Sequence, residues 1–230
     1  TLATAFLFPG LCFTGFWMVN LFIWYRGSTG AVPFFSLLVL LFIWIGMNVP
    51  LTFIGASIGK RRTPISIPVS TNKIPRVVPS MPFWRGLFLS HTLGGLLPFG
   101  AMFTEYFFIM NSIWQHRFYY LFGFVIMVLV LLILIVAEVS IVSTYIQLCG
   151  EDYHWWWRSF LVSGSCALYM FCYAIVFFFQ RLKVQEVVPT LVYFGYMSLV
   201  TCGLWLMLGA VGVMASFRFV KTIYGSIKVD

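Results

Sequence analysis

Six long apolar stretches constrain this chain of 230 residues more than any other feature of its sequence. An α-helix needs about 20 mostly apolar residues to cross the hydrocarbon layer of a bilayer. The stretches cover residues 5–25, 32–58, 86–113, 119–148, 158–179 and 188–217. They are continuous and do not alternate apolar with polar residues, so they predict helices and not barrel strands. The predicted fold class is an all-α polytopic membrane protein, a single transmembrane domain over residues 1–230 with about six helices.

The composition excludes a water-soluble fold. Hydrophobic residues make up 61% of the chain and charged residues only 9%, and a soluble protein of this kind would expose large apolar patches. The five cysteines form no CxxC pair and no metal-ligand spacing, so we predict no metal, no cofactor and small apolar packing roles. S-acylation is an alternative for one of them, Cys149. The cysteines are Cys12, Cys149, Cys166, Cys172 and Cys202.

The net charge of +8 reports membrane topology and does not predict a nucleic-acid partner, because the basic residues lie in the loops between the spans. Alternate loops carry 10 and 4 of the 14 basic residues. The richer side has Lys60, Arg61, Arg62, Lys73, Arg76, Arg85, Arg158, Arg218, Lys221 and Lys228. The positive-inside rule therefore places this side, and both chain ends, in the cytosol. The chain starts at Thr1 without a signal-peptide pattern, so we expect it to be part of a longer protein.

The cytosolic loop 59–85 holds five of the ten prolines, which predicts a semi-rigid strap along the membrane face. Its basic residues either bind anionic lipid headgroups or simply form a solvated positive-inside loop. The residues of this basic strap are Lys60, Arg61, Arg62, Lys73 and Arg76.

No catalytic motif is present, so the chain is not expected to be an enzyme. It has no HExxH, GxSxG, GxGxxG or phosphate-binding loop. Its only aspartates, Asp152 and Asp230, lie outside the spans, which excludes an intramembrane aspartyl protease.

The spans contain two acidic residues, Glu105 and Glu138, and a histidine, His91. A charge inside the bilayer costs free energy, so each of these side chains needs a hydrogen-bonding or ionic partner, or a water-filled cavity. If the third and fourth spans form a hairpin, Glu105 and Glu138 lie at different depths, whereas His91 and Glu138 lie within about one turn of each other. We therefore predict a contact between His91 and Glu138. The carboxyl groups serve either as structural fixtures or in a proton- or ion-linked role.

Small residues also mark the second span, where Gly55 and Gly59 form a small-xxx-small pair. Such pairs let helices approach closely in lipid. We favour packing within the bundle over a groove for a client helix.

The segment between the fourth and fifth spans is unusually rich in polar and aromatic residues. We predict that its two acidic residues cap the next helix, that its tryptophans anchor at the interface, and that its lone histidine does not bind metal. This interfacial loop comprises Glu151, Asp152, His154, Trp155, Trp156, Trp157 and Arg158.

Seven segments in family order resemble the nonaspanins, the transmembrane 9 superfamily. They are VPLTFIGA at 49–56, TNKIPR at 71–76, LPFGA at 97–101, NSIW at 111–114, EDYHWWWRSF at 151–160, YFGY at 193–196 and the terminal KVD at 228–230. Ser70 and Met81 depart from the family pattern, which has Arg and Gln there. Family members have a lumenal domain and nine spans, so this chain would match the last six, without the ectodomain and the first three spans.

The resemblance implies a non-enzymatic protein of Golgi and endosomal membranes that sorts other membrane proteins to the surface, with roles in adhesion and phagocytosis. The implied partners are membrane lipids, glycine-rich transmembrane cargo, the missing lumenal domain, and the COP-I coat, which would read Lys228 and Asp230 as a retrieval signal. A frayed basic tail is the plain alternative for these two residues. The alternative function is a proton- or ion-linked transporter or channel that uses Glu105, Glu138 and His91.

Overall fold

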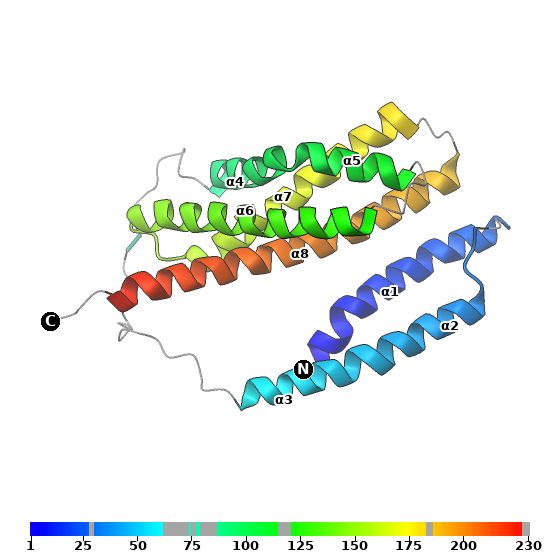
Figure 1. The fold of residues 1–230 in the computed structure, drawn as a ribbon, viewed down its shortest axis with the longest axis horizontal. Coiled ribbons are helices and arrows are strands. Elements are labelled where there is room, and N and C mark those ends of the chain that lie inside the picture. Colours follow the sequence, from blue (N-terminus) through cyan, green and yellow to red (C-terminus); the bar gives the residue numbers. More distant parts are fainter. Residues whose placement is uncertain are drawn as a thin grey trace. The chain divides into compact units, whose positions relative to one another are not determined.

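The computed structural model describes residues 1–27, 30–61, 74, 77–78, 87–114, 121–182 and 186–226, and within these ranges all regular structure is helical (Figure 1). The helices are α1 (Leu2–Tyr25), α2 (Phe34–Ile43), the π-helical turn η1 (Trp44–Asn48), α3 (Val49–Lys60), α4 (Leu87–Ala101), α5 (Phe103–Trp114), α6 (Leu121–Cys149), α7 (Trp155–Phe177), the π-helical turn η3 (Phe178–Leu182) and α8 (Val187–Ser226).

Five of these helical segments are long and apolar enough to cross a membrane, and the bent pair α4 and α5 would make a sixth span. The predicted all-α polytopic class is therefore confirmed. Two helices extend beyond the predicted spans: the fifth starts at Trp155, and the last one continues to Ser226. Hydropathy marks where a helix leaves the hydrocarbon layer, and the backbone hydrogen bonds continue beyond that point.

The predicted third span, 86–113, is not one straight helix. It is broken at Met102, where the axis bends by 65°. Pro98 has no backbone N–H to donate to the preceding turn, and the Met102 N–H is shared between the carbonyls of Pro98 (3.1 Å) and Phe99 (3.2 Å). The proline was visible in the sequence, but its effect on the direction of the helix was not predicted.

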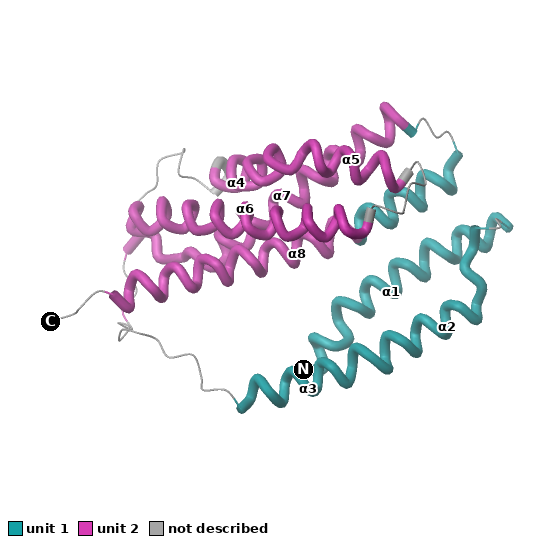
Figure 2. Tube along the Cα trace, viewed as in Figure 1, with its two compact units in different colours: residues 1–66, 182–199 teal, residues 67–181, 200–230 magenta. Residues whose placement is uncertain are grey.

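The chain divides into two compact units (Figure 2). Unit 1 comprises Thr1–Ser66 and Leu182–Leu199, and unit 2 comprises Ile67–Arg181 and Val200–Asp230. Helix α8 contributes to both units, so the division falls within a helix, and the single transmembrane domain stays a prediction.

In unit 1, the turn between α1 and α2 is closed by one side chain. The Asn20 amide donates to the Val32 carbonyl (3.1 Å) and its oxygen accepts from the Val32 backbone N–H (2.9 Å). Asn20 is 1% exposed. Both hydrogen-bonding ends of a buried amide are thus satisfied by one backbone residue.

A second polar contact in unit 1 repairs a helix interrupted by proline. Pro9 lies inside α1 and cannot donate to the carbonyl of Ala5, four residues earlier. The Asn48 side chain donates to that carbonyl instead, at 2.7 Å. In lipid no water can take this role, so the asparagine joins η1 to α1 by satisfying a freed backbone group.

Unit 2 is built around α7, half of whose most apolar stretch is buried. Glycines let its neighbours come within backbone contact. A Cβ added at Gly95 of α4 would lie 2.8 Å from the Ser165 backbone carbon, and one added at Gly212 of α8 would lie 3.0 Å from the Ser159 carbonyl oxygen. Such distances leave no room for a side chain at either glycine.

Candidate functional site

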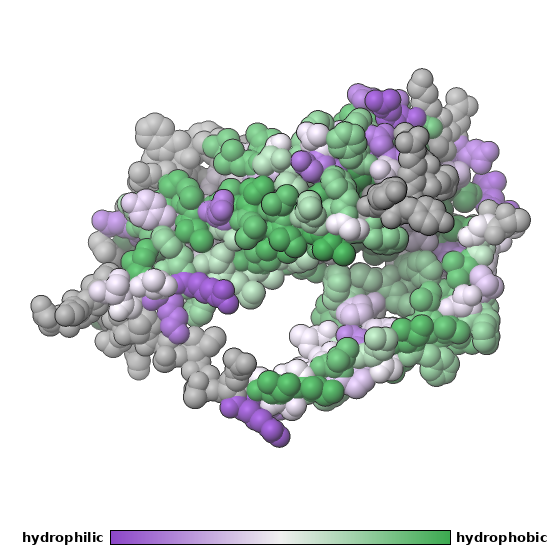
Figure 3. Space-filling view, viewed as in Figure 1, coloured by the Kyte–Doolittle hydropathy of each residue, from purple (hydrophilic) through white to green (hydrophobic). Residues whose placement is uncertain are grey.

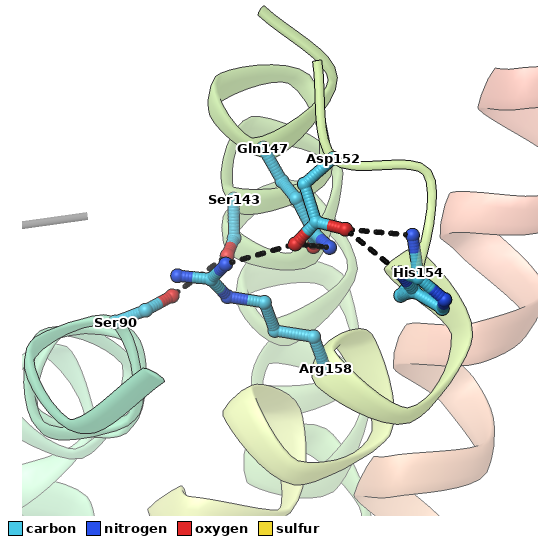
Figure 4. Close-up of polar contacts among 6 residues, drawn as sticks. All are labelled: Ser90, Ser143, Gln147, Asp152, His154 and Arg158. Atoms are coloured by element: carbon cyan, nitrogen blue, oxygen red, sulfur yellow. Dashed lines mark hydrogen bonds and ion pairs between the residues drawn. The ribbon is translucent and has the colours of Figure 1, made fainter. Parts of the chain in front are cut away.

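A cluster of charged and polar side chains lies at the turn between α6 and α7, in unit 2 (Figure 4). Its centre is Asp152. One carboxylate oxygen, Oδ2, accepts from the Gln147 amide at 3.0 Å and lies 3.6 Å from the Arg158 Nη1. The other, Oδ1, accepts from the His154 backbone N–H (3.0 Å) and lies 3.1 Å from the His154 Nδ1. The aspartate thus ties the end of α6 to the start of α7.

The electrostatics of the cluster keep Asp152 ionised. Burial opposes ionisation, but the hydrogen bonds from the His154 backbone, the His154 ring and the Gln147 amide outweigh it and lower the pKa of Asp152 below 3.8. The side chains of Arg158 and Asp152 are 11% and 15% exposed. The carboxylate therefore balances a guanidinium that is largely buried among helices.

The N-cap of α7 is His154, whose side chain makes no capping hydrogen bond, and not one of the two predicted acidic residues. The Asp152 carboxylate accepts a hydrogen bond from the His154 N–H, which stabilises the turn before the helix. Glu151 in this turn takes a left-handed backbone conformation with φ of 59°. The prediction correctly placed both acids just before the helix, but the Asp152 carboxylate accepts from the N–H of the N-cap residue His154 and not from one in the first turn.

The three tryptophans of the interfacial loop form the first turn of α7. Trp156 and Trp157 are 43% and 68% exposed, whereas the Trp155 ring lies 6.4 Å from the Phe217 ring of α8. They point in different directions, as three consecutive helical residues must. Anchoring at the membrane interface stays a prediction.

His91 lines a pocket of about 420 Å³ in unit 2. The other lining residues are Leu161, Ser165, Leu168 and Trp205. The Ser165 hydroxyl donates to the His91 carbonyl at 2.9 Å, which fixes this part of α4 on α7. Neither Glu105 nor Glu138 lines the pocket.

The predicted contact between His91 and Glu138 is not formed: within the described ranges, no hydrogen bond or ion pair joins them. His91 faces α7, and Glu138 lies on the exposed face of α6, since Val136 and Ser140 on either side of it are buried. Glu105 is half-buried in the first turn of α5, and its Oε2 is buried with no hydrogen-bond partner among the described residues.

A buried hydroxyl cluster between α6 and α8 was missed by the sequence analysis. The Ser216 hydroxyl lies 2.9 Å from that of Ser140 and 2.8 Å from that of Thr144, and Ser140 also donates to the Gly212 carbonyl at 3.0 Å. The signal was present as a polar stripe at helical spacing, residues 140, 144 and 147, in an otherwise apolar helix.

Comparison with known proteins decides the family. The family model for endomembrane protein 70 matches residues 1–187. This chain belongs to the transmembrane 9 superfamily. It is 47% identical over 229 residues to transmembrane 9 superfamily member 10 of Arabidopsis thaliana, with 100% of this chain and 36% of the relative covered. It is 45% identical over 227 residues to member 4 of Homo sapiens, covering 99% and 35%. Member 2 of Mus musculus is 44% identical over 229 residues, covering 100% and 35%.

The resemblance to the nonaspanins is thereby confirmed, and this member of the transmembrane 9 superfamily is a multi-pass membrane protein. The chain spans about a third of the length of the relatives it matches. No solved structure matches it.

Several predicted site residues of this superfamily member lie outside the described ranges, namely Arg62, Lys73 and Arg76 of the strap and Lys228 and Asp230 of the coat signal. Lys60 and Arg61 are described and exposed at the end of α3. The lipid-binding strap and the coat signal therefore stay predictions.

Among the cysteines, Cys166 is buried and Cys12 is half-buried, as the predicted packing roles require, whereas Cys149, Cys172 and Cys202 are exposed. Intramembrane packing by Gly55 and Gly59 is also not seen, because a Cβ added at either would meet nothing within 4 Å.

Proposed function

We propose that this nonaspanin chain sorts other membrane proteins in the Golgi and endosomes, and that α3 receives glycine-rich transmembrane helices of the cargo. The observation that carries the proposal is the open pair Gly55 and Gly59, one turn apart on α3, with no atom within 4 Å of an added Cβ. Membership of the transmembrane 9 superfamily supports a function within a membrane.

The physical basis is close backbone approach. In lipid, helices associate through van der Waals packing, and small residues let two backbones meet. The α7 backbone already occupies the space beside Gly95, whereas the space beside Gly55 and Gly59 is empty. A cargo helix with glycines of its own fits against α3 in the way that α4 fits against α7.

The surroundings of the pair suit a membrane-embedded contact. Ile54 and Ile58 next to the glycines are 55% and 54% exposed, and hydrophobic residues cover much of the visible surface (Figure 3). Lys60 and Arg61 follow directly and suit the anionic headgroups of a cytosolic leaflet. The sorting role that we propose is non-enzymatic.

The remaining parts of the proposal concern routing. Retrieval by the COP-I coat through Lys228 and Asp230 would return the protein to the Golgi after it has escorted cargo. The Lys228 ammonium and the Asp230 carboxylate offer charge-assisted contacts.

The test is delivery of a glycine-rich single-span cargo in cells that lack the endogenous protein and express it at its natural length. Gly55→Leu with Gly59→Leu should lower the cargo at the cell surface about fivefold, because a contact of about 1 kcal/mol is lost. The matched control is Gly46→Leu with Gly123→Leu, two other glycines with open surroundings on η1 and α6. Equal delivery by both double variants would refute cargo binding at α3.

A further inference from the structure

We propose that Glu138 marks a second docking face, on α6, for a transmembrane helix that carries a lysine or arginine near the middle of the bilayer. This inference does not depend on cargo sorting by α3, since it uses other residues and another kind of recognition.

The first step is the depth of Glu138. Helix α6 has 29 residues, and is about 43 Å long at 1.5 Å per residue. Glu138 lies about 16 Å from its end at Cys149, and so about 5 Å from its middle. It is too deep for a short glutamate side chain to reach the headgroups.

The second step is its direction. Leu134 and Val142, one turn before and after Glu138, are 55% and 56% exposed, and Glu138 is exposed with them. The opposite face, with Ser140 and Thr144, is buried against α8. Glu138 therefore stands in the centre of an outward apolar face.

The third step is cost. A carboxylate facing lipid near the bilayer centre costs about 3 kcal/mol on insertion scales, and such residues almost always face protein or water. Within the described ranges no hydrogen bond or ion pair engages Glu138. We take protein, and not water, to cover this face in the membrane, because its exposed neighbours Leu134 and Val142 are apolar.

The chemistry of the face selects the occupant. Leu134 and Val142 hold a partner helix at the ordinary interaxial distance of about 8–10 Å. A long lysine or arginine side chain spans that gap to the carboxylate, whereas a serine does not. A basic side chain in lipid carries a similar insertion cost, and pairing with Glu138 offsets both costs through a charge-assisted hydrogen bond.

The experiment uses the protein at its natural length in microsomes, together with a tagged single-span reporter of leucine and alanine with one central lysine. We expect the protein to co-purify this reporter about tenfold better than a reporter with leucine in that place, as a polar contact of 1–2 kcal/mol predicts. Moving the lysine by two turns should abolish the preference.

Variants assign the effect to one side chain. Glu138→Leu should remove the preference and Glu138→Gln should reduce it, while Glu105→Gln, the matched change on α5, should leave it intact. Glu138→Lys should transfer the preference to a reporter with a central glutamate. Glu138→Gln keeps the side-chain size. It therefore tests the role of the carboxylate charge even if Glu138→Leu folds poorly.

Three outcomes would overturn the proposal: equal capture of the lysine and leucine reporters, a preference that survives Glu138→Gln and Glu138→Leu unchanged, or no capture of any reporter. The last would mean that the protein's own helices cover the face. The cargo test on Gly55 and Gly59 is unaffected by any of these results.

Discussion

Two spans of this membrane protein, α7 in unit 2 and the span of α2, η1 and α3 in unit 1, differ in how glycines are used around them. In unit 2, glycines of α4 and α8 bring their backbones against α7, and half of the most apolar stretch of α7 is buried. In unit 1, the span formed by α2, η1 and α3 has only 6% of its most apolar stretch buried, and Gly55 and Gly59 meet nothing. A glycine in a span thus indicates a capacity for close approach, and the neighbouring helices decide whether the chain itself uses it.

The largest effect on stability is expected from adding a side chain at a glycine that contacts a neighbouring helix. Gly95→Leu would force α4 away from the α7 backbone, and the free energy of unfolding should fall by about 3 kcal/mol. Gly55→Leu makes the same change in open space and should leave stability unaltered. The measurement is the fraction of monodisperse protein after heating in detergent. Equal losses in both variants would contradict the division into used and open glycines.

A smaller effect is expected where unit 1 relies on a polar contact. Asn48→Ala would leave the Ala5 carbonyl without a donor, at a cost of about 2 kcal/mol. In a Pro9→Ala background the N–H of residue 9 can serve that carbonyl, so the same change should cost much less. A double-mutant cycle by thermal unfolding measures the coupling between the two positions. Additive effects would show that Asn48 does not replace the missing proline N–H.

The smallest effect concerns the pH dependence of the turn between α6 and α7. The pKa of Asp152 is lower in the folded protein than its ordinary value of 3.8, so its contribution is complete well above pH 3.8 and is lost as the pH falls through the folded pKa. Asp152→Asn should therefore cost about 1 kcal/mol at pH 7 and progressively less as the pH falls below 3.8. Melting curves of both proteins across this range provide the check. A constant difference at every pH would rule out the carboxylate charge as the cause.

The spans were predictable because insertion is a sum of local transfer free energies. About 20 apolar residues determine a crossing whatever their neighbours are. The break at Met102 was not predictable in the same way. Pro98 removes one hydrogen bond, but how far the helix then bends depends on how its neighbours pack around it.

The site residues show a second limit. A residue count along a helical hairpin gives the depth of each residue in the bilayer. His91 and Glu138 lie at similar depths by this count, which predicts a contact between them. The count does not give the rotation of each helix about its axis, which turns His91 toward Ser165 and Glu138 outward. The hydroxyl stripe of Ser140 and Thr144 does carry that information, because buried hydroxyls in lipid must face a partner.

The Asn20 amide has a consequence for how the protein is made. Its donor and acceptor are both satisfied by Val32, twelve positions later in the chain. We expect the Asn20 amide to stay unsatisfied during synthesis until Val32 is available, so that α1 and the start of α2 enter the bilayer together.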